Sequence, residues 1–488
     1  MRFYDREREL ARLNEIASLS RRSSHLVVVT GRRRVGKTEL IRRFAERRKD
    51  VLYFFVSRKK PHVLLEEYRD LLSGRFPTLR RAAFPDFGEF FRFIFDAMEE
   101  RPLFVVFDEF QNFRNVDPSA FSTLQDLWDR RKDSVKGALV CIGSVQTLMR
   151  DIFEGTKEPL FGRATARLYV EPLSPDTVAE ILSDRRLDPA RHLPFYFTLF
   201  GGVPKYHFLL DRHNLFGKPR EEIIRKLFCE ADAPLQNEGR ELLIEEFGRN
   251  YHLYFSILEV IASGETQMAR IADGAGINVN SISKYLDELV SQYRVVERRV
   301  PVTAPRGEHK SGRYHIGDPA LRFWFRYVHR YRTLLEIGEE KEAARKIAND
   351  LPTLMGRSFE ELVRALLVRR NGEGVLPFRF SRIGGFWSRK GDVEIDVVAF
   401  DEKEENILFG ECKLDGARFT RREAVRLREK ALAVKRRGRG GKEHFALFCA
   451  APVPRREKDS LIREGVAVWD LGALLRAPFT ESQSPPVS

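Results

Sequence analysis

Hydrophobic positions in the first 150 residues occur in two kinds of run. Short apolar runs, rich in β-branched and aromatic residues and typical of buried parallel strands, occupy residues 25–30, 51–56, 103–107 and 139–142. Between these runs the apolar residues recur at helical spacing, as do Leu10, Leu13 and Ile16 within residues 5–20. Strands that alternate with helices predict a doubly wound α/β sheet. Residues 175–246 then follow a mostly helical pattern.

The pattern changes near residue 250. We expect three successive helices and then an extended run, over residues 255–263, 267–273, 279–291 and 294–300. The polar stretch 303–312 would form a turn, and residues 313–316 would return as a second strand. This order predicts a helix-turn-helix followed by a β-wing. The aromatic segment 319–330 is expected to pack beneath it.

The last third of the chain predicts another α/β domain. The charged residues 336–345 indicate a helical connector, and from Gly356 the pattern runs helix, strand, strand, helix, strand. The first two of those strands cover residues 393–398 and 407–413. The Pro- and Ser-rich residues 481–488 are expected to form a disordered tail.

Composition narrows the class of protein. Hydrophobic residues make up 43% and charged residues 32%, which is typical of a soluble globular chain. The net charge of +14 makes nucleic acid, DNA in particular, a candidate partner, although a charge-rich solvated surface has the same composition. The four cysteines match neither a zinc nor a disulfide pattern, which favours a reducing interior. Without an apolar leader or a run of about 20 apolar residues, the sequence predicts a cytoplasmic protein with no membrane partner.

One Gly-rich loop lies between the first strand and a helix. Its residues fit the pattern G-x-x-x-x-G-K-[ST]: Gly31, Arg32, Arg33, Arg34, Val35, Gly36, Lys37 and Thr38. The glycines let backbone N–H groups face phosphate oxygens, and the following helix adds its positive end. We therefore predict an ATP site in which Lys37 contacts the β- and γ-phosphates and Thr38 ligates Mg²⁺.

Acidic residues end the third strand, where ligands of parallel sheets gather. We expect Asp108 to hold Mg²⁺, directly or through water, and Glu109 to orient or deprotonate the attacking water. Ser144 follows the fourth strand and is a candidate sensor of the γ-phosphate. A simple Gly-Ser turn explains Ser144 equally well.

A second acidic group follows residue 356. Side chains alternate across a strand, so Glu411 and Lys413 share one face. Asp396, on the neighbouring strand, can then share a divalent metal with Glu411, and Lys413 can position a water or stabilise developing charge. Glu360 could complete the ligand shell or bind a second metal, and Glu394 is an alternative ligand. These groups suit Mg²⁺-dependent hydrolysis of a phosphodiester; charged strand edges without a metal are the alternative.

Two further regions are suited to phosphate contacts with nucleic acid. In the expected recognition helix and wing the candidates are Asn280, Ser283, Lys284, Arg298, Arg299, Arg306, Lys310 and Arg313. After Lys413 a dense basic stretch comprises Arg418, Arg421, Arg422, Arg426, Arg428, Lys430, Lys435, Arg436, Arg437 and Arg439. A protein-docking module and a solvated helix face are the respective alternatives.

Three segments together resemble a known family. Residues 3–7 (FYDRE), 107–111 (FDEFQ) and 202–204 (GVP) are similar to those of archaeal-type ATPases of the STAND/AAA+ class. The resemblance implies that Arg6 lies near the adenine and that residues 202–204, ending in Pro204, open a lid helix against the nucleotide. It also matches Arg163 to a position that acts in trans as an arginine finger in a homo-oligomer; an ordinary surface arginine is the equal alternative.

The helix–strand–strand pattern of Glu360, Asp396, Glu411 and Lys413 resembles the PD-(D/E)xK nuclease superfamily, although no Pro-Asp pair precedes Asp396. Residues 383–413 resemble the nuclease-like domain that follows archaeal-type ATPases. The resemblance implies an α/β chain with a P-loop NTPase core, a helical lid, a winged helix and a restriction-endonuclease-like domain. The expected bounds, including the tail, are 1–180, 181–246, 247–335, 336–480 and 481–488.

These sites predict a protein that binds and hydrolyses ATP and couples this switch to a DNA-binding, Mg²⁺-dependent nuclease domain. One alternative is an ATP-dependent DNA-binding or signalling switch whose nuclease fold is catalytically inactive. Another is a scaffold that assembles through its ATPase module and never contacts DNA.

Overall fold

The chain forms two compact units. A computed structural model describes residues 2–77, 79, 83–248, 251–305, 312–434 and 441–476. The N-terminal unit comprises residues 2–172 and 203–205, and the C-terminal unit comprises residues 173–202 together with the chain from residue 206 onward. None of the helices in these described ranges combines the length and the apolar character needed to cross a bilayer.

The N-terminal unit is built on a parallel sheet with strand order β2-β3-β4-β1-β5. Its strands are β1 (Ser24–Thr30), β2 (Val51–Phe55), β3 (Leu103–Asp108), β4 (Gly137–Ile142) and β5 (Ala166–Tyr169). The four predicted strands and the parallel α/β sheet are confirmed. The sequence pattern does not indicate β5, because its four residues include an arginine and form no apolar run.

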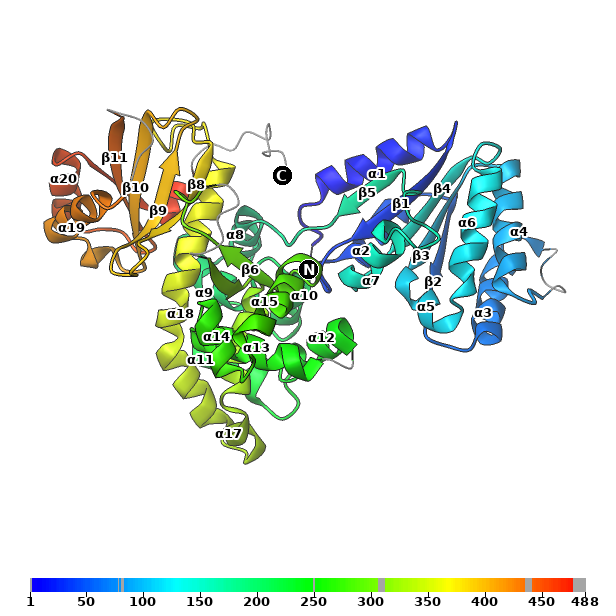
Figure 1. The fold of residues 1–488 in the computed structure, drawn as a ribbon, viewed down its shortest axis with the longest axis horizontal. Helices are drawn as coiled ribbons and strands as arrows, with labels where there is room; N and C mark the ends of the chain where they lie inside the picture. The colour runs from blue at the N-terminus through cyan, green and yellow to red at the C-terminus, as the bar shows by residue number, and fades with distance from the viewer. Residues whose placement is uncertain are drawn as a thin grey trace. The chain divides into compact units, whose positions relative to one another are not determined.

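Helices cover both faces of this sheet (Figure 1). Alternate residues of a strand face opposite sides, so each side has its own core. Val27 and Val29 of β1 share one core with α1 (Glu7–Leu19) and α2 (Lys37–Ala45). The other core includes α3 (Pro61–Ser73), α4 (Phe87–Glu100), η2 (Phe110–Asn112), α5 (Phe113–Val116), α6 (Ser119–Arg131) and α7 (Gln146–Glu154).

Phenylalanine side chains fill much of this second core. Phe54 of β2 is fully buried, and its ring centroid lies 4.8 Å from that of Tyr68, 5.2 Å from Phe90 and 5.5 Å from Phe107. Its neighbour Phe55 points the other way and is 52% exposed. The aromatic rings therefore join β2, β3, α3 and α4 into one packed layer.

The C-terminal unit begins with a helical region, as predicted for residues 175–246. It contains α8 (Pro175–Asp184), α9 (Pro189–Phe200), α11 (Arg220–Ile224), the π-helical turn η3 (Arg225–Cys229) and α12 (Glu238–Phe247). It also contains α10 (Pro204–Arg212) from residue 206 onward, whereas the first two residues of α10 belong to the N-terminal unit. Before α10, the Leu173 N–H donates to the Gly202 carbonyl at 2.7 Å. A β-carbon at Gly202 would lie 1.8 Å from the Leu173 oxygen, so this close approach requires glycine.

Three helices and a two-stranded hairpin follow. The helices are α13 (Tyr251–Ser263), α14 (Met268–Gly274) and α15 (Val279–Asp287), which continues as the π-helical turn η5 (Glu288–Gln292). β6 (Val296–Arg299) and β7 (Arg313–Ile316) pair antiparallel, and we call these two strands the hairpin. The predicted order of elements is present. The predicted wing residues Arg306 and Lys310 lie outside the described residues.

The aromatic segment after the hairpin packs as expected. It forms α16 (Pro319–Phe323) and the π-helical turn η6 (Trp324–His329), followed by α17 (Arg332–Glu336). Phe325 contacts Phe255 of α13 with ring centroids 4.8 Å apart.

A single helix, α18 (Glu340–Arg369), then runs for 30 residues. The prediction of a connector followed by a separate helix from Gly356 is wrong here, because α18 continues through Pro352. It packs against α9, α11 and η3 and also against β8, β9 and β10. Burial on two sides compensates for the backbone hydrogen bond that proline cannot donate.

The C-terminal sheet has strand order β12-β11-β10-β9-β8. Its elements are β8 (Arg382–Trp387), β9 (Glu394–Phe400), β10 (Asn406–Lys413), η7 (Gly416–Arg418), α19 (Arg421–Ala431), β11 (Lys442–Cys449), α20 (Arg455–Arg463), β12 (Val466–Asp470) and α21 (Leu471–Arg476). β9 runs antiparallel to β8 and β10, whereas β10, β11 and β12 are parallel. The predicted order contained β9, β10, α19 and β11 but lacked β8, α20 and β12.

Replacing Phe54 by alanine should lower the free energy of unfolding by about 3–5 kcal/mol, because it empties a site enclosed by other rings. Phe55→Ala is the matched control on the same strand and should cost roughly 0.5 kcal/mol, since Phe55 is half exposed. Urea unfolding of the full chain, followed by far-UV circular dichroism, measures both values. Equal losses in the two variants would contradict this core.

Candidate functional site

The Gly-rich loop joins the end of β1 to the start of α2. Gly31 (φ 151°) and Gly36 (φ 91°) both lie at positive φ, and a β-carbon on Gly31 would lie 2.4 Å from the Val170 oxygen. Lys37 is 6% exposed, and its Nζ donates to the carbonyl oxygens of Gly31 and Arg32, each at 2.9 Å. The loop carbonyls therefore hold the lysine ammonium group in this structure.

The other loop residues divide by burial. Val35 is fully buried in the core beneath α2, and the side chains of Arg32, Arg33 and Arg34 are half-buried along the loop. Arg34 also has a positive φ of 68°. The loop thus keeps its backbone close to the core, and its arginines are only partly exposed.

A hydroxyl and a carboxylate meet beside the start of α2. Thr38 Oγ1 donates to Asp108 Oδ2 at 2.7 Å, although the two residues come from separate segments. The Tyr53 hydroxyl donates to the same oxygen at 2.6 Å, and burial together with this bond raises the pKa of Tyr53. Hydroxyl and carboxylate oxygens are the ligands Mg²⁺ prefers, so the donor set fits that ion. The sequence did not indicate Tyr53 as a site residue, because nothing in the pattern of β2 shows that its hydroxyl reaches Asp108 at the end of β3.

Glu109 and Ser144 lie together at the carboxyl ends of β3 and β4. The Ser144 hydroxyl donates to Glu109 Oε2 at 2.7 Å, and the Gln111 amide donates to the same oxygen. Glu109 has a φ of 58°, which is uncommon for a residue with a side chain and often marks a functional position. The contact between Ser144 and Glu109 goes beyond a plain turn, and Gln111 was not anticipated as a partner.

Arg6 and Pro204 lie against the loop. Arg6 is 4% exposed, donates to the Val35 carbonyl at 3.0 Å and pairs with Glu9 at 2.8 Å. The Pro204 ring lies 3.9 Å from the position of a β-carbon on Gly36. Both positions are adjacent to the loop.

Arg163 is held by a surface partner. Its guanidinium contacts Asp129 at 2.6 Å and donates to the Pro159 carbonyl at 2.7 Å. In this structure the side chain is therefore oriented by its own unit.

The second group of acids lies where β9 and β10 run side by side. The last paired residues, Val397 and Gly410, put Asp396 next to Glu411 one step further along. Asp396 Oδ2 accepts the Cys412 N–H at 2.8 Å. Between the pairs Gly384–Val398 and Phe386–Ile395 the register shifts, and β9 contains one residue more than β8. Such a bulge redirects a side chain, and here it falls at Asp396.

Glu411 is buried and bound by two lysines. Its Oε2 lies 2.9 Å from Lys430 Nζ of α19, and its Oε1 lies 3.4 Å from Lys413 Nζ. Glu411 and Lys413 do share a strand face, as alternation predicts. The role of Lys430 was missed, because the sequence shows only one basic residue within a basic helix.

Glu360 of α18 approaches Asp396 from another element. Burial and the Asp396 carboxylate raise the pKa of Glu360, and burial and the Glu411 carboxylate raise the pKa of Asp396. Arg364 lies 3.9 Å from Glu360 and donates to the Asp396 carbonyl at 2.6 Å. Carboxylates crowded in this way are stabilised by protons or cations.

The predicted ligands are close to one another but are not arranged as a finished metal site. Within the part of the chain that the structure describes, no three acidic, His or Cys side chains are placed to hold one ion. Both oxygens of Glu411 face lysines instead. The donor chemistry fits Mg²⁺, and binding there would require Glu411 to exchange a lysine for the ion.

Several residues predicted to contact metal or nucleic acid have other partners. Glu394, the predicted alternative ligand, pairs with Arg313 at 3.0 Å. Arg299 contacts both Glu297 and Glu361 at 2.9 Å, rather than lining an open wing. Arg298 lies over the ring of Tyr314. The exposed residues of α15 remain available: Asn280, Ser283 and Lys284.

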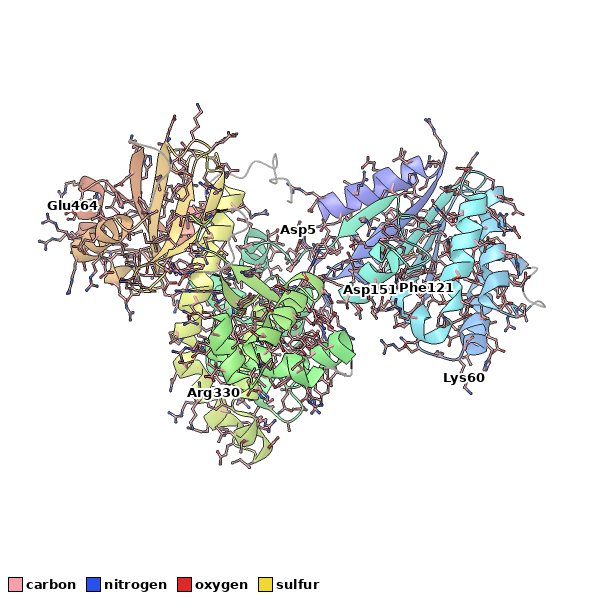
Figure 2. All side chains as sticks on the ribbon, viewed as in Figure 1. Asp5, Lys60, Phe121, Asp151, Arg330 and Glu464 are labelled. Atoms are coloured by element: carbon pink, nitrogen blue, oxygen red, sulfur yellow. The ribbon has the colours of Figure 1, made fainter. Side chains whose placement is uncertain are left out.

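The basic stretch near α19 is largely paired. Arg421 contacts the Glu464 carboxylate at 2.9 Å, and Arg428 donates to the Glu464 carbonyl at 2.6 Å; Glu464 is labelled beside α20 in Figure 2. Arg426 pairs with Glu423. Arg418 and Arg422 are exposed and make no ion pair with any described residue. Lys435, Arg436, Arg437 and Arg439 lie outside the described residues.

Residues 3–206 match the model of an ATPase domain found predominantly in Archaea. Residues 324–426 match DUF234, described as archaeal and bacterial proteins of unknown function. The uncharacterised protein MJECL04 of Methanocaldococcus jannaschii is 30% identical over 411 residues, which cover 84% of this chain and 87% of that protein.

Among solved structures, the chain is similar to the Walker-type ATPase PABY2304 of Pyrococcus abyssi, at 21% identity and a TM-score of 0.51, over 66% of this chain and 96% of that one. It is also similar to the ORC2 protein of Aeropyrum pernix, in ADPNP and ADP complexes, at 16% identity and a TM-score of 0.41, over 68% and 94%. The first of these likenesses shows the P-loop ATPase fold. The chain therefore belongs to one family with the Methanocaldococcus jannaschii protein, and its own N-terminal region is an ATPase domain of the predominantly archaeal type.

Proposed function

We propose that this protein hydrolyses ATP and uses the nucleotide state to control a metal-dependent nuclease site in its C-terminal unit. One observation carries the second half of the proposal: Asp396, Glu411 and Lys413 lie at the adjoining ends of β9 and β10, and Glu360 faces them from α18. Carboxylates beside lysines, in a partly water-excluded place, are suited to phosphodiester chemistry.

In the ATPase domain each residue receives a distinct role. Lys37 contacts the β- and γ-phosphates, and the loop from Gly31 to Gly36 supplies backbone N–H groups. Thr38 and Asp108 hold Mg²⁺, which neutralises charge on the phosphates when bound. Glu109 orients or deprotonates the attacking water, and its bonds from Ser144 and Gln111 fix the direction of its carboxylate.

Arg6 and Pro204 border the nucleotide in this proposal. The contact of Arg6 with the Val35 carbonyl supports a position beside the adenine end of the loop. Pro204, next to Gly36, supports a role for α10 as the lid helix that senses the nucleotide. A homo-oligomer through the ATPase domain, with Arg163 released from Asp129 to reach a neighbour, belongs to the same proposal.

At the second site, Asp396, Glu411 and Glu360 would hold Mg²⁺, which supplies an activated water and neutralises developing charge when bound. Lys413 stabilises the charge that builds on the scissile phosphate. The Lys430 ammonium group lies 2.9 Å from Glu411 Oε2, which supports a role for it as a stand-in for the metal ion.

DNA is the proposed substrate class. In this proposal α13, α14, α15 and the hairpin form a winged helix whose exposed residues Asn280, Ser283 and Lys284 face a groove. Arg418, just before α19, and Arg422, on α19, are exposed, have no ion pair among the described residues and add positive charge there.

A second candidate function is an ATP-dependent switch with an inactive nuclease fold. The pairing of both Glu411 oxygens with lysines favours this reading, as does the lack, among the described residues, of a three-ligand group. It predicts ATP turnover and salt-sensitive DNA binding without strand cleavage.

For the ATPase, Lys37→Ala should abolish turnover, because the γ-phosphate loses its cation. Glu109→Gln should retain ATP binding but slow hydrolysis about 100-fold or more, since an amide is a poor base. Phosphate release measures turnover and calorimetry measures ATP affinity. Glu39→Gln, an exposed change on α2, is the control. Turnover at the wild-type rate in Lys37→Ala would refute the loop assignment.

For the nuclease, Asp396→Asn should remove plasmid nicking in Mg²⁺ or Mn²⁺, because it deletes the central carboxylate charge. Asp459→Asn changes an exposed aspartate on α20 and should cut at the wild-type rate. Gel electrophoresis of supercoiled plasmid, with and without ATP, measures the rates. Equal background cleavage in wild type and Asp396→Asn would leave the inactive-fold candidate.

A further inference from the structure

The hairpin does not stand free but contacts α18 and β9, two of the elements that carry the acidic site. We propose that it is a clamp that positions Glu360 and Asp396, and that Arg299 and Arg313 are positioning residues. The inference rests on the proposed nuclease site and adds a structural role for the predicted wing. Three sets of contacts carry it, all within the C-terminal unit.

The first set is an ion-pair cluster around Glu361 of α18. Arg322 of α16 contacts its two oxygens at 2.7 and 2.9 Å, and Arg299 of β6 contacts it at 2.9 Å. Burial alone would raise the pKa of Glu361, but the two guanidinium groups outweigh burial and hold that pKa well below its usual range. Glu361 is therefore a charged anchor between the hairpin and α18.

This anchor also fixes Glu360. Adjacent residues on a helix are about 100° apart around its axis, so holding Glu361 sets the direction of its neighbour. Glu360 lies on the side of α18 toward Asp396, because Arg364 is 3.9 Å from Glu360 and donates to the Asp396 carbonyl at 2.6 Å. A hairpin contact is thus one residue away from a proposed metal ligand.

The second set holds the start of β9. The Arg313 guanidinium of β7 lies 3.0 Å from the Glu394 carboxylate and 4.6 Å from the centre of the Trp387 ring. Trp387 and Glu394 are paired across β8 and β9, so one arginine contacts both strands. Stacking on an aromatic ring and a carboxylate contact reinforce each other for a planar guanidinium.

The third set lies along the outer edge of the sheet. The Val302 N–H, just beyond β6, donates to the Gly385 carbonyl of the edge strand β8 at 3.0 Å. A β-carbon on Gly384 would lie 3.3 Å from Val302 Cβ, which is closer than ordinary contact. Gly384 therefore leaves room for the segment after β6 to lie against β8 and to cover part of its edge.

These contacts matter because Asp396 lies at the register shift of β9. A bulged residue is not held by regular pairing with β8, so its direction depends on the supports on either side. On one side the Cys412 N–H binds its carboxylate at 2.8 Å, and on the other Arg313 holds Glu394, two residues away. Loss of the contact between Arg313 and Glu394 should therefore weaken the hydrogen bond from the Cys412 N–H to the Asp396 carboxylate.

The test uses the full chain with Arg313→Ala and with the charge exchange Arg313→Glu plus Glu394→Arg. Calorimetry measures Mn²⁺ affinity, plasmid nicking measures the half-saturating Mn²⁺ concentration, and hydrogen exchange measures the peptide containing the Cys412 amide. We expect Arg313→Ala to weaken Mn²⁺ binding and to accelerate this exchange by about three- to tenfold. The double variant Arg313→Glu plus Glu394→Arg restores an ion pair with reversed charges. It should therefore recover at least part of the Mn²⁺ affinity and part of the slow hydrogen exchange at Cys412.

Arg345→Ala is the matched control, because it removes another arginine–glutamate contact of α18, with Glu342, away from the hairpin. It should leave all three readouts unchanged. Arg313→Lys keeps the charge but not the flat stack on Trp387 and should fall between wild type and Arg313→Ala.

The outcomes separate the two proposals. If the wild-type protein neither binds Mn²⁺ nor cuts DNA, the proposed nuclease function is refuted. The hydrogen-exchange rate of the Cys412 amide in Arg313→Ala then tests the clamp independently. If Arg313→Ala keeps both the wild-type hydrogen-exchange rate at the Cys412 amide and the wild-type Mn²⁺ affinity, the clamp is refuted even if the nuclease is active.

Discussion

Strand register decides where both groups of polar side chains lie. In the N-terminal unit the parallel strands end at one edge, so Thr38 meets Asp108 and Ser144 meets Glu109 although long segments separate the two members of each pair. In the C-terminal unit the antiparallel pairing of β9 and β10 has the same effect for its carboxylates. A shift of one residue would turn each side chain to the opposite face, so the hydrophobic cores that fix register also fix the chemistry.

The long helix α18 links the parts of the C-terminal unit. Its start packs on the lid-region helices, and near its end Arg369 and Arg370 pair with Asp176 of α8. Between these regions, Glu361 of α18 forms an ion pair with Arg299 of the hairpin. A buried carboxylate with two arginine partners is costly to separate, because either guanidinium, once removed, leaves charge uncompensated. Contacts of α18 therefore connect the helical region, the hairpin and the acidic strands within the C-terminal unit.

Features set by neighbouring residues could be predicted from the sequence, whereas the partners of individual side chains could not. The Gly-rich loop and Asp108 could be predicted, because motif residues adjoin a strand and a helix whose patterns are clear. Lys430 could not be assigned to Glu411, since charge composition says nothing about which partner a basic side chain meets. The partner of Arg313 could not be predicted either: the wing pattern suggested a contact with DNA, and the structure pairs Arg313 with Glu394. Continuity of α18 was missed because Pro352 normally indicates a helix end, and only tertiary burial overrides it.

The placement of Trp387 has an optical consequence. Of the four tryptophans in the chain, Trp128 alone belongs to the ATPase unit. Trp387 carries the Arg313 guanidinium over its ring. Indole emission responds to a nearby cation and to water, so the intrinsic fluorescence of this protein contains a native signal from the junction between β7 and β8. A variant that keeps Trp387 and replaces Trp324 and Trp469 would isolate this signal from the rest of the C-terminal unit without any attached dye.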